Sequence, residues 1–262
     1  KPGSRKGPLI ETDAEGTLVV FVRERAVDGA ANTAVEKALA AHFGVSDETI
    51  RRDLKGLSGD GVVEKFHGGV RLAQPSDEPP FERRLKEATE AKERIAERAA
   101  RHIREGATVL IDNSTTACFF ARQLLHREPM TILTISLEIA QIFAAANSRH
   151  RVILPGGEVR TGDRTLTGLN TIEFLSGFTP SYFVTSVVAG SPRGLHDFDM
   201  FEAEFKRTMI PLADQTMVLM DSSKFGKSGL VHVCSWADVD VLVTDGVPDN
   251  ISACLENGHL LL

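Results

Sequence analysis

The sequence predicts an α/β protein of two domains, an N-terminal winged helix-turn-helix domain and a C-terminal domain with a mainly parallel β-sheet. Two helical segments joined by a short turn and followed by a β-hairpin predict the first domain. From residue 107 onward, short apolar runs alternate with helical stretches, as in a parallel sheet covered by helices. A proline-bearing stretch separates the two patterns. The expected boundaries are a disordered tail at 1–15, the first domain at 16–73, a linker and linker helix at 74–106, and the second domain at 107–262.

Residues 45–58 predict a capped helix with one cationic side. Ser46 stands at the N-cap position, and Asp47 and Glu48 lie in the first turn, where the positive end of the helix dipole favours acids. Apolar residues recur at helical spacing on one side, whereas short polar groups and cations share the other. The cationic side holds Thr49, Arg51, Arg52 and Lys55.

The neighbours of this helix complete a helix-turn-helix with a wing. Residues 33–43 predict a preceding helix, and Gly44 stands at the junction. Residues 61–71 predict a small β-hairpin that carries Lys65, His67 and Arg71. An amphipathic surface helix with an incidental arginine pair would explain the arginines alone. It would not explain the preceding helix, the glycine turn and the hairpin together.

The segment VSDETIRRDLKGL and the hairpin that ends in HGGV resemble the DNA-binding domain of the DeoR family of bacterial transcriptional regulators. The resemblance implies that the helix after Ser46 enters the major groove, where arginine can pair with guanine edges, while Lys55 and the wing cations contact phosphates. By the family's order, residues 17–26 should form the first helix of the domain, although the valines at 19, 20 and 22 prefer strands. The expected DNA-contacting residues are Thr33, Ser46, Glu48, Thr49, Arg51, Arg52, Lys55, Lys65, His67 and Arg71.

The charge of the chain limits how the N-terminal domain could hold DNA. The net charge is −6, but residues 1–73 hold 11 Lys or Arg and 11 Asp or Glu, so the deficit lies entirely in the rest of the chain. A neutral domain has no bulk attraction for DNA, and its attraction must come from cations clustered on one surface. We therefore expect modest, salt-sensitive affinity per subunit and a need for dimerisation.

A long charged helix is expected at 81–105, after a connector that contains Pro75, Pro79 and Pro80. Its apolar residues form one narrow stripe, and the DeoR family has a similar linker helix that begins with a similar Pro-Pro-Phe segment. Two interpretations are open for this helix. It either docks on the second domain as a solvated helix or contributes to a contact between subunits.

The second domain is expected to contain six strands and five helices. The ligand of such a sheet is expected at the carboxyl ends of its strands. The expected strands are 108–111, 130–135, 151–154, 182–188, 217–220 and 239–244, and the expected helices are 116–125, 137–146, 170–175, 200–213 and 250–256.

Polar residues follow several of these strands. Residues 112–116 (DNSTT) lead from the first strand into a helix, where hydroxyls and unpaired N–H groups can cradle an anion, although simple N-capping by Ser114 or Thr115 is the alternative. Gly156 and Gly157 allow close backbone approach, and residues 221–226 (DSSKFG) bring a carboxylate, hydroxyls and an ammonium to the same edge. Glu202 and Lys206 share one helix face, as either a surface ion pair or ligand groups.

These segments resemble the carboxyl-terminal sugar-phosphate sensor domain of the DeoR family, whose fold is related to ribose-5-phosphate isomerase and CoA-transferase domains. The resemblance covers most of the chain from about residue 17. The effector-binding residues that it implies are Asp112, Asn113, Ser114, Thr115, Thr116, Ser136, Gly156, Gly157, Glu202, Lys206, Asp221, Ser223 and Lys224.

Three departures from the family pattern bear on the ligand. Residues 185–188 replace a Gly-Ala-Asp-Gly segment, Ile135 replaces an asparagine, and Asn113-Ser114 replaces Ser-Gly in the phosphate loop. The sequence therefore supports phosphate binding better than recognition of a particular sugar, and the wall that faces the sugar is either remodelled or partly disabled.

The leading hypothesis is a DNA-binding transcriptional regulator, a repressor of carbohydrate metabolism genes, whose operator binding is modulated by a phosphorylated sugar or related metabolite. We expect a homodimer or homotetramer, and the effector could weaken or strengthen DNA binding. The alternative is a sugar-phosphate isomerase or transferase-like enzyme with an accessory DNA-binding domain. Val187 stands where such an enzyme would need a carboxylate, although Asp112 and Asp221 could serve as bases. A third interpretation is a DNA-bound protein without a small-molecule ligand.

The composition predicts a cytoplasmic protein without a membrane partner. The 262 residues are 42% hydrophobic and 25% charged, no run approaches the ~18 apolar residues of a membrane span, and the N-terminus lacks the apolar stretch of a signal peptide. The three cysteines, Cys118, Cys234 and Cys254, have neither disulfide-framework nor metal-site spacing. We expect no cofactor, no metal and no catalytic residues.

Overall fold

The chain forms two compact units, Lys1–Arg83 and Arg84–Leu262. The structure is a computed structural model that describes residues 2–12, 18–25, 30–59, 63–66, 69–72, 79–227, 229–255 and 260–261. The division between the units falls inside the linker expected at 74–106. None of the helices in the described part of the chain is both long and apolar enough to cross a membrane.

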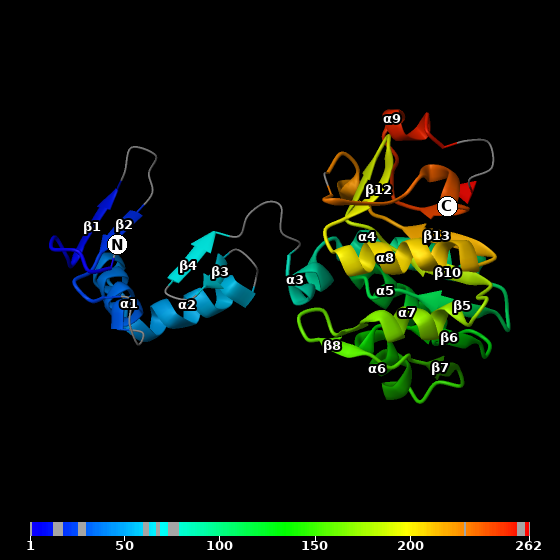
Figure 1. Cartoon of the computed structure of the whole chain (residues 1–262), viewed down its shortest axis with the longest axis horizontal. Coiled ribbons are helices and arrows are strands. Elements are labelled where there is room, and N and C mark those ends of the chain that lie inside the picture. Colours follow the sequence, from blue (N-terminus) through cyan, green and yellow to red (C-terminus); the bar gives the residue numbers. More distant parts are fainter. Residues whose placement is uncertain are drawn as a thin grey trace. The chain divides into compact units, whose positions relative to one another are not determined.

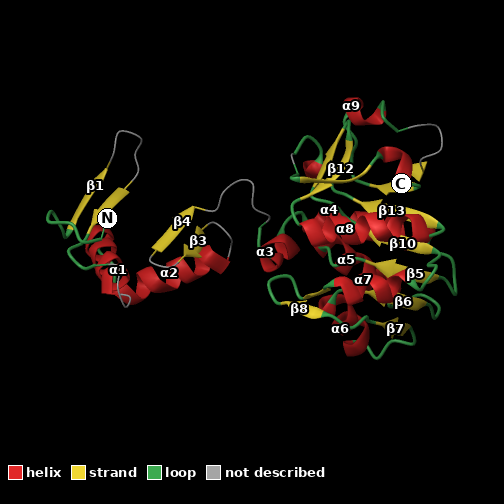
Figure 2. Cartoon of the chain, in the orientation of Figure 1, coloured by secondary structure: helices red, strands yellow, loops and turns green. Residues whose placement is uncertain are grey.

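The N-terminal unit contains the helix-turn-helix and the hairpin that the sequence predicts (Figure 2). Helix α1 (Ala30–Phe43) is followed by Gly44 at a φ of +67°, a backbone conformation that glycine adopts without strain, and then by α2 (Asp47–Gly59). Ser46 caps α2 as expected, since its Oγ accepts a hydrogen bond of 3.2 Å from the N–H of Thr49. Strands β3 (Val63–Phe66) and β4 (Gly69–Leu72) pair in antiparallel fashion as the wing.

Two expectations at the N-terminus are wrong. Residues 18–21, expected in a helix at 17–26, form strand β2 (Leu18–Phe21), which pairs antiparallel with β1 (Leu9–Thr12). Strand β1 also lies within residues 1–15, which were expected to be disordered. The β-branched residues of this segment favour the extended backbone, and local propensity prevails over the element order that the family resemblance implies.

The linker helix expected at 81–105 is interrupted. The structure contains α3 (Phe81–Lys86) and α4 (Thr89–His102), separated at Ala88, whose φ of 50° is rare for a residue with a side chain. Phe81 and Ile95 are both buried, so the apolar stripe continues across the break. Hydrophobic periodicity alone could therefore not reveal the interruption.

The C-terminal unit is built on a seven-stranded parallel sheet with the order β16-β15-β13-β10-β5-β6-β7. All six expected strands are confirmed, with small differences at their ends. The strands are β5 (Thr108–Ile111), β6 (Thr131–Thr134), β7 (Arg151–Ile153), β10 (Tyr182–Thr185), β13 (Gln215–Leu219), β15 (Val241–Val243) and the short β16 (Leu260–Leu261).

Helices cover both faces of this sheet, with α4 and α5 behind it and α7 and α8 in front in the view of Figure 1. The five helices that the sequence predicts after the linker are all present. They are α5 (Thr115–Leu124), α6 (Leu137–Ala145), α7 (Leu169–Ser176), α8 (Met200–Met209) and α9 (Asp249–Ser252), and a short 3-10 turn at Ile210–Leu212 extends α8.

Two small antiparallel sheets were not expected from the sequence. One is the hairpin of β8 (Glu158–Arg160) and β9 (Thr165–Thr167). The other contains β11 (Ala189–Ser191), β12 (Gly194–Asp197) and β14 (Val231–Cys234). Both lie in segments that follow strands of the parallel sheet in the chain, so they add walls to the edge at which a ligand was expected.

Candidate functional site

The candidate effector site lies where the strand order of the sheet reverses. From β5 the chain proceeds to β6 and β7 on one side, whereas β10, β13 and β15 lie on the other. Ligands of open α/β sheets bind at such a switch point, outside the carboxyl ends of the two central strands. The loops after β5 and β10 are therefore the first to consider, and both contain the polar residues 112–116 and 185–186.

Asp112 joins these two loops and is completely buried. Its Oδ2 accepts hydrogen bonds from the Thr185 hydroxyl (2.7 Å) and from the N–H of Ser186 (2.8 Å). Its Oδ1 accepts from the N–H of Ser114 (2.9 Å). Since both oxygens have partners within the chain, Asp112 fixes the shape of the site and is less suited to direct contact with an effector than its place in the sequence suggested.

The N-terminus of α5 retains the features of an anion cradle. Ser114 caps the helix, with its Oγ accepting from the N–H of Ala117 at 3.1 Å, so the capping alternative is confirmed for Ser114. Two buried atoms beside it, Oδ1 of Asn113 and Oγ1 of Thr116, have no hydrogen-bond partner among the described residues. A buried polar atom without a partner is costly, and a ligand with hydrogen-bond donors and acceptors could satisfy both.

Lys224 reaches the same place from the other side of the switch point. The 3-10 turn Ser222–Lys224 follows β13, and the Lys224 ammonium donates to Oγ of Ser186 (2.8 Å) and to the carbonyl of Val187 (2.7 Å). Ser186 thus contacts both Asp112 and Lys224, and the expected convergence of residues 112–116 with Lys224 is confirmed. Asp221 caps the turn and holds Ser223 through its N–H and hydroxyl, so these two residues orient Lys224.

Lys206 lies at the centre of a buried charge cluster. Its ammonium is 2.6 Å from Oδ2 of Asp197, 3.6 Å from Oε2 of Glu202 and 4.0 Å from Oδ2 of Asp112. Burial alone would lower the pKa of Lys206, but these carboxylates more than offset it and raise the pKa. The surface ion pair considered for Glu202 and Lys206 is therefore wrong, because both residues are buried and connect α8 to the loop after β5.

The hairpin β8–β9 closes one side of this cluster through Arg160, which sequence reasoning did not identify. Its guanidinium donates to both oxygens of Asp163 and to Glu202, and one nitrogen lies 3.0 Å from Oδ2 of Asp199. The Asn113 amide also donates to Asp163 and Glu202, at 3.4 and 3.1 Å. Since these contacts join residues 113, 160 and 202, no local sequence pattern could have revealed them.

Lys92 on α4 adds a cation that the sequence also did not reveal. The side chain is buried and donates to the backbone carbonyl of Arg84. Burial, together with the positive charge of Lys224, lowers the pKa of Lys92 to about 8. Two neighbouring cations at the edge of the sheet produce a positive potential that would attract a phosphate.

Ser136, Gly156 and Gly157 have packing roles in the structure. The Ser136 hydroxyl caps α6 by accepting from the N–H of Ile139 at 3.2 Å. A Cβ on Gly157 would lie 2.3 Å from Oγ1 of Thr171, whose hydroxyl donates to the carbonyl of Gly156 at 2.9 Å. Glycine is therefore required at 157 for the β8–β9 segment to pack against α7. A contact of Ser136, Gly156 or Gly157 with an effector stays a prediction.

Glu202 gives this cluster a defined response to acid. Burial would raise its pKa, but Lys206, Arg160 and the Asn113 amide together lower the pKa from 4.5 to about 2. A carboxyl whose pKa is lower in the folded state stabilises the fold above its unfolded pKa and loses this contribution as the pH falls toward the folded value. Between pH 4.5 and 2, wild-type stability should therefore fall more steeply than that of Glu202→Gln, measured by urea denaturation at each pH. Parallel curves for the two proteins would contradict the assigned role of Glu202.

The candidate DNA-binding surface lies on α2 of the N-terminal unit. Arg52 is the more exposed of the two arginines on α2, with 76% of its side chain exposed, and it forms a long ion pair with Asp53 at 4.0 Å. Arg51 instead pairs with Glu36 of α1 at 2.8 Å, which raises its pKa and ties the two helices together. Glu48 lies 3.8 Å from Arg51. Arg51 is therefore partly structural, a role that the sequence did not show.

The remaining predicted DNA contacts are less well defined. Lys55 and Thr33 are exposed on α2 and α1, and the Thr49 hydroxyl is 2.9 Å from that of the cap Ser46. Lys65 and Arg71 lie on the two wing strands, but only their backbone is described. His67 falls outside the described residues. Their contact with DNA stays a prediction.

Family models match both units of the chain. A DeoR-like helix-turn-helix domain matches residues 32–76, and a DeoR C-terminal sensor domain matches residues 87–246.

Curated relatives cover most of the chain. The glycerol-3-phosphate regulon repressor of Escherichia coli (strain K12) is 34% identical over 226 residues, which span 86% of this chain and 89% of the relative. The HTH-type transcriptional repressor CsqR of the same organism is 36% identical over 211 residues, 80% of each chain. The HTH-type transcriptional regulator IolR of Bacillus subtilis (strain 168) is 30% identical, covering 77% of this chain and 80% of the relative.

Solved structures share only a distant likeness with the chain. One is eIF2B delta from Chaetomium thermophilum, with a TM-score of 0.46 and 14% identity over 62% of this chain and 58% of that one. Ribose 5-phosphate isomerase A from Neisseria gonorrhoeae has a TM-score of 0.38 and 13% identity over 51% and 52% of the two chains. Likeness at this level carries no conclusion about function.

Proposed function

Because the chain belongs to the DeoR family of transcriptional regulators, we propose that it is a DNA-binding repressor whose operator affinity is modulated by a phosphorylated metabolite. The observation that carries the proposal is the arrangement at the switch point of the sheet. There Ser186 links Asp112, just before the N-terminus of α5, to Lys224, and two buried polar atoms of the α5 segment have no hydrogen-bond partner among the described residues. Helix N-termini and clustered cations both favour a phosphate.

Two of the relatives suggest the chemical class of the effector. Their names refer to regulation of glycerol-3-phosphate genes, and the shared sensor domain covers the loops described above. We infer a small polyol or sugar phosphate, with the phosphate at the α5 N-terminus and Lys224. Its hydroxyls would face the acidic side of the site, where Glu202 and Asp163 accept hydrogen bonds.

Regulation requires that the effector have different affinities for two conformations of the protein. Lys92 offers a route for such coupling, because it contacts the backbone of Arg84 at the very start of the C-terminal unit. A phosphate near Lys92 and Lys224 would change the charge balance beside this segment. The segment leads directly into the DNA-binding unit, which we place in the cytoplasm with its operator.

Replacing Lys224 by alanine should weaken effector binding at least tenfold, because a charge-assisted hydrogen bond to phosphate is lost. Titration calorimetry with glycerol 3-phosphate, fructose 6-phosphate and inorganic phosphate measures the effect. Operator affinity without effector should be retained, since Lys224 lies in the C-terminal unit.

The matched control for this experiment is Lys227→Ala, which removes an exposed lysine three residues away. It should bind the same compounds as the wild type does. Equal affinity of Lys224→Ala and wild type for a compound that binds would remove Lys224 from the site. If the wild type binds none of the panel and shows no thermal shift, the interpretation without a small-molecule ligand gains support.

The enzyme alternative finds little support in the site. Val187, at the position where a carboxylate would be needed, is a valine buried in an apolar cluster and cannot accept a proton. Both oxygens of Asp112 accept hydrogen bonds from the chain, so Asp112 is not a free base either. The relatives are named as transcriptional regulators. Substantial turnover of ribose 5-phosphate or glucosamine 6-phosphate by the purified protein would revive this alternative.

A further inference from the structure

The 3-10 turn that carries Lys224 is held at both of its ends. At one end, the Lys224 ammonium donates to Oγ of Ser186 at 2.8 Å. At the other end, the N–H of Ser222 donates to Oδ1 of Asp245 at 2.7 Å. Asp245 lies in the loop after β15, and only 20% of its side chain is exposed. The loop after β15 is therefore the second support of this turn.

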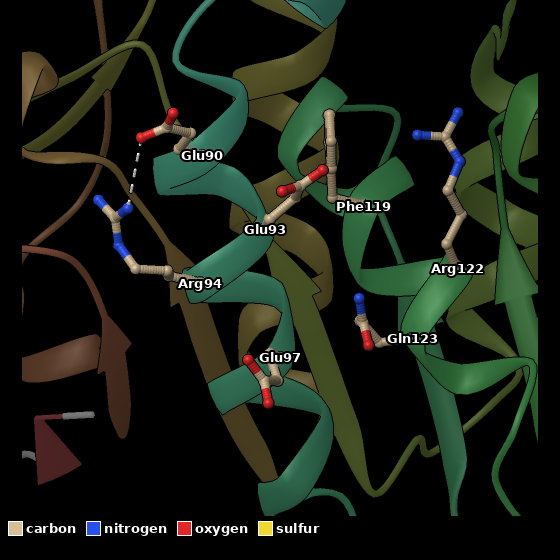
Figure 3. A pocket seen from close by; sticks show the side chains of 7 residues that line it. All are labelled: Glu90, Glu93, Arg94, Glu97, Phe119, Arg122 and Gln123. Carbon is tan, nitrogen blue, oxygen red and sulfur yellow. Dashed lines mark ion pairs between the residues drawn. The ribbon is translucent and has the colours of Figure 1, made fainter.

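The second oxygen of Asp245 contacts helix α4. Its Oδ2 is 3.8 Å from Nη2 of Arg94. One helical turn further on, Nη1 of Arg98 donates to the carbonyl of Thr244, the neighbour of Asp245, at 3.3 Å. Figure 3 shows the Arg94 side chain directed away from α5, where it also pairs with Glu90 at 4.0 Å. A single carboxylate thus joins α4 to the turn that follows β13.

Helix α4 is in turn tied to the start of the C-terminal unit. The Lys92 ammonium donates to the backbone carbonyl of Arg84, the first residue of this unit. Arg84 continues directly from Arg83, the last residue of the N-terminal unit. A displacement of α4 would therefore act on the segment through which the two units are joined in the chain.

We propose that Asp245 is a positioning residue that transmits binding of the effector from the Lys224 turn to α4. This inference rests on the proposed function, since it concerns the effector that binds beside Lys224. Its basis is the carboxylate that contacts the turn through one oxygen and the helix through the other. Neither contact alone would couple the two elements.

The expected movements begin at Lys224. A bound phosphate would attract its ammonium, which then gives up its contacts with the loop after β10. Since the turn has only three residues, Ser222 would move with Lys224. The planar carboxylate of Asp245 would follow the Ser222 N–H, and its pair with Arg94 would weaken. Helix α4 would then be held less firmly to the loop after β15.

Hydrogen–deuterium exchange of the full-length chain tests this coupling without effector or operator. Lys224→Ala removes the contacts of the ammonium and so imitates their loss on effector binding. Amides of residues 89–102 should then exchange about two- to fivefold faster than in the wild type, the value of one partly exposed ion pair. Asp245→Asn keeps an acceptor for the Ser222 N–H but not the charge that holds Arg94, so it should have the same effect.

The decisive measurement is Lys224→Ala in several backgrounds. In Asp245→Asn and in Arg94→Ala it should cause no further increase, since the pair that carries the change is already absent. In Arg94→Lys, which keeps the charge, the increase should return. The matched control is Arg101→Ala, because Arg101 pairs with Glu97 on its own helix, and Lys224→Ala should have its full effect there.

Two results would overturn the proposal. One is exchange of α4 that Lys224→Ala leaves unchanged, and the other is an effect of Lys224→Ala that persists in full in the Asp245→Asn background. The second result would assign the coupling to direct repulsion between Lys92 and Lys224. Fluorescence of the buried Trp236 checks that each variant is folded, and Arg94→Ala replaces Asp245→Asn if the latter unfolds.

Failure of this inference is distinguishable from failure of the proposed function. Exchange is measured without effector, whereas calorimetry tests whether Lys224 binds it. If Lys224→Ala loses effector affinity but leaves α4 unchanged, the proposed function stands and Asp245 has no part in the response. If α4 responds through Asp245 but calorimetry removes Lys224 from the site, the connection between turn and helix stands and its role in effector sensing is wrong.

Discussion

Replacing Lys206 by methionine should lower the free energy of unfolding of the C-terminal unit by about 3–5 kcal/mol, the usual cost of breaking a buried ion pair from one side. Lys206 is 2% exposed, and its ammonium is shared by Asp112, Asp197 and Glu202. Methionine fills a similar volume but leaves the three buried carboxylates without their common cation. The same carboxylates shape the switch-point loops, so effector binding should be lost together with stability.

Tryptophan fluorescence can report this transition from the C-terminal unit alone. The chain has a single tryptophan, Trp236, which is buried and donates a hydrogen bond of 2.8 Å to the carbonyl of Ser191. Lys86→Met serves as the control, because Lys86 is exposed and its loss should change stability by less than about 0.5 kcal/mol. A Lys206→Met protein that unfolds at the wild-type denaturant concentration would show that the cluster does not hold the unit together.

A second substitution separates charge from packing. Burial raises the pKa of Asp197 to about 6, although Lys206 opposes this rise. Without Lys206, Asp197 is a buried carboxyl that has lost its counter-charge, so Asp197→Asn in the Lys206→Met background should recover part of the lost stability. An additive further loss would indicate that the hydrogen bond from the N–H of Val188 to Asp197 matters more than its charge.

Strands of the parallel sheet were predictable because their residues are apolar and β-branched over short runs. Such strands, buried on both faces, leave a clear signal in the sequence. The convergence of residues 112–116 with Lys224 was predictable for a related reason. Carboxyl ends of parallel strands meet at one edge, so polar residues that follow different strands are brought together.

Other parts of the site were not predictable from the sequence. Glu202 and Lys206 have the same i,i+4 spacing whether a helix face is exposed or buried, and only the packing of α8 on β12 and the loop after β5 decides between them. Arg160 lies on a three-residue strand with no distinctive pattern, and two of its partners, Asp199 and Glu202, are far away in the chain. The hairpin β1–β2, by contrast, has a signal in the sequence, because its valines favour a strand. The helix expected at this place came from the element order of the family instead.

Arg52→Ala should reduce affinity for the operator on the order of 10- to 100-fold, which is the value of one bidentate contact between arginine and guanine. Arg52 is largely exposed and only loosely paired with Asp53, whereas Arg51 is held by Glu36 of α1. The structure therefore favours Arg52 as the base-reading arginine of α2. Combined replacement of both arginines should abolish specific binding while the protein stays folded. The measurement is a mobility-shift titration on a fragment recovered from genomic DNA with the wild-type protein, alongside a scrambled fragment of equal length.

Salt dependence distinguishes base contact from phosphate contact at this surface. Each phosphate contact contributes about −0.9 to the slope of log affinity against log salt concentration. Lys55→Ala, at an exposed position of α2, should weaken binding to the operator and to the scrambled fragment alike. It should also make the slope shallower by about 0.9, the contribution of one phosphate contact. Arg52→Ala should instead leave the slope nearly unchanged and lower the preference for the operator. If Arg52→Ala binds the operator with wild-type affinity, α2 does not read DNA through Arg52. If it behaves as Lys55→Ala does, Arg52 contacts the backbone, and specificity must come from Thr49 or the wing.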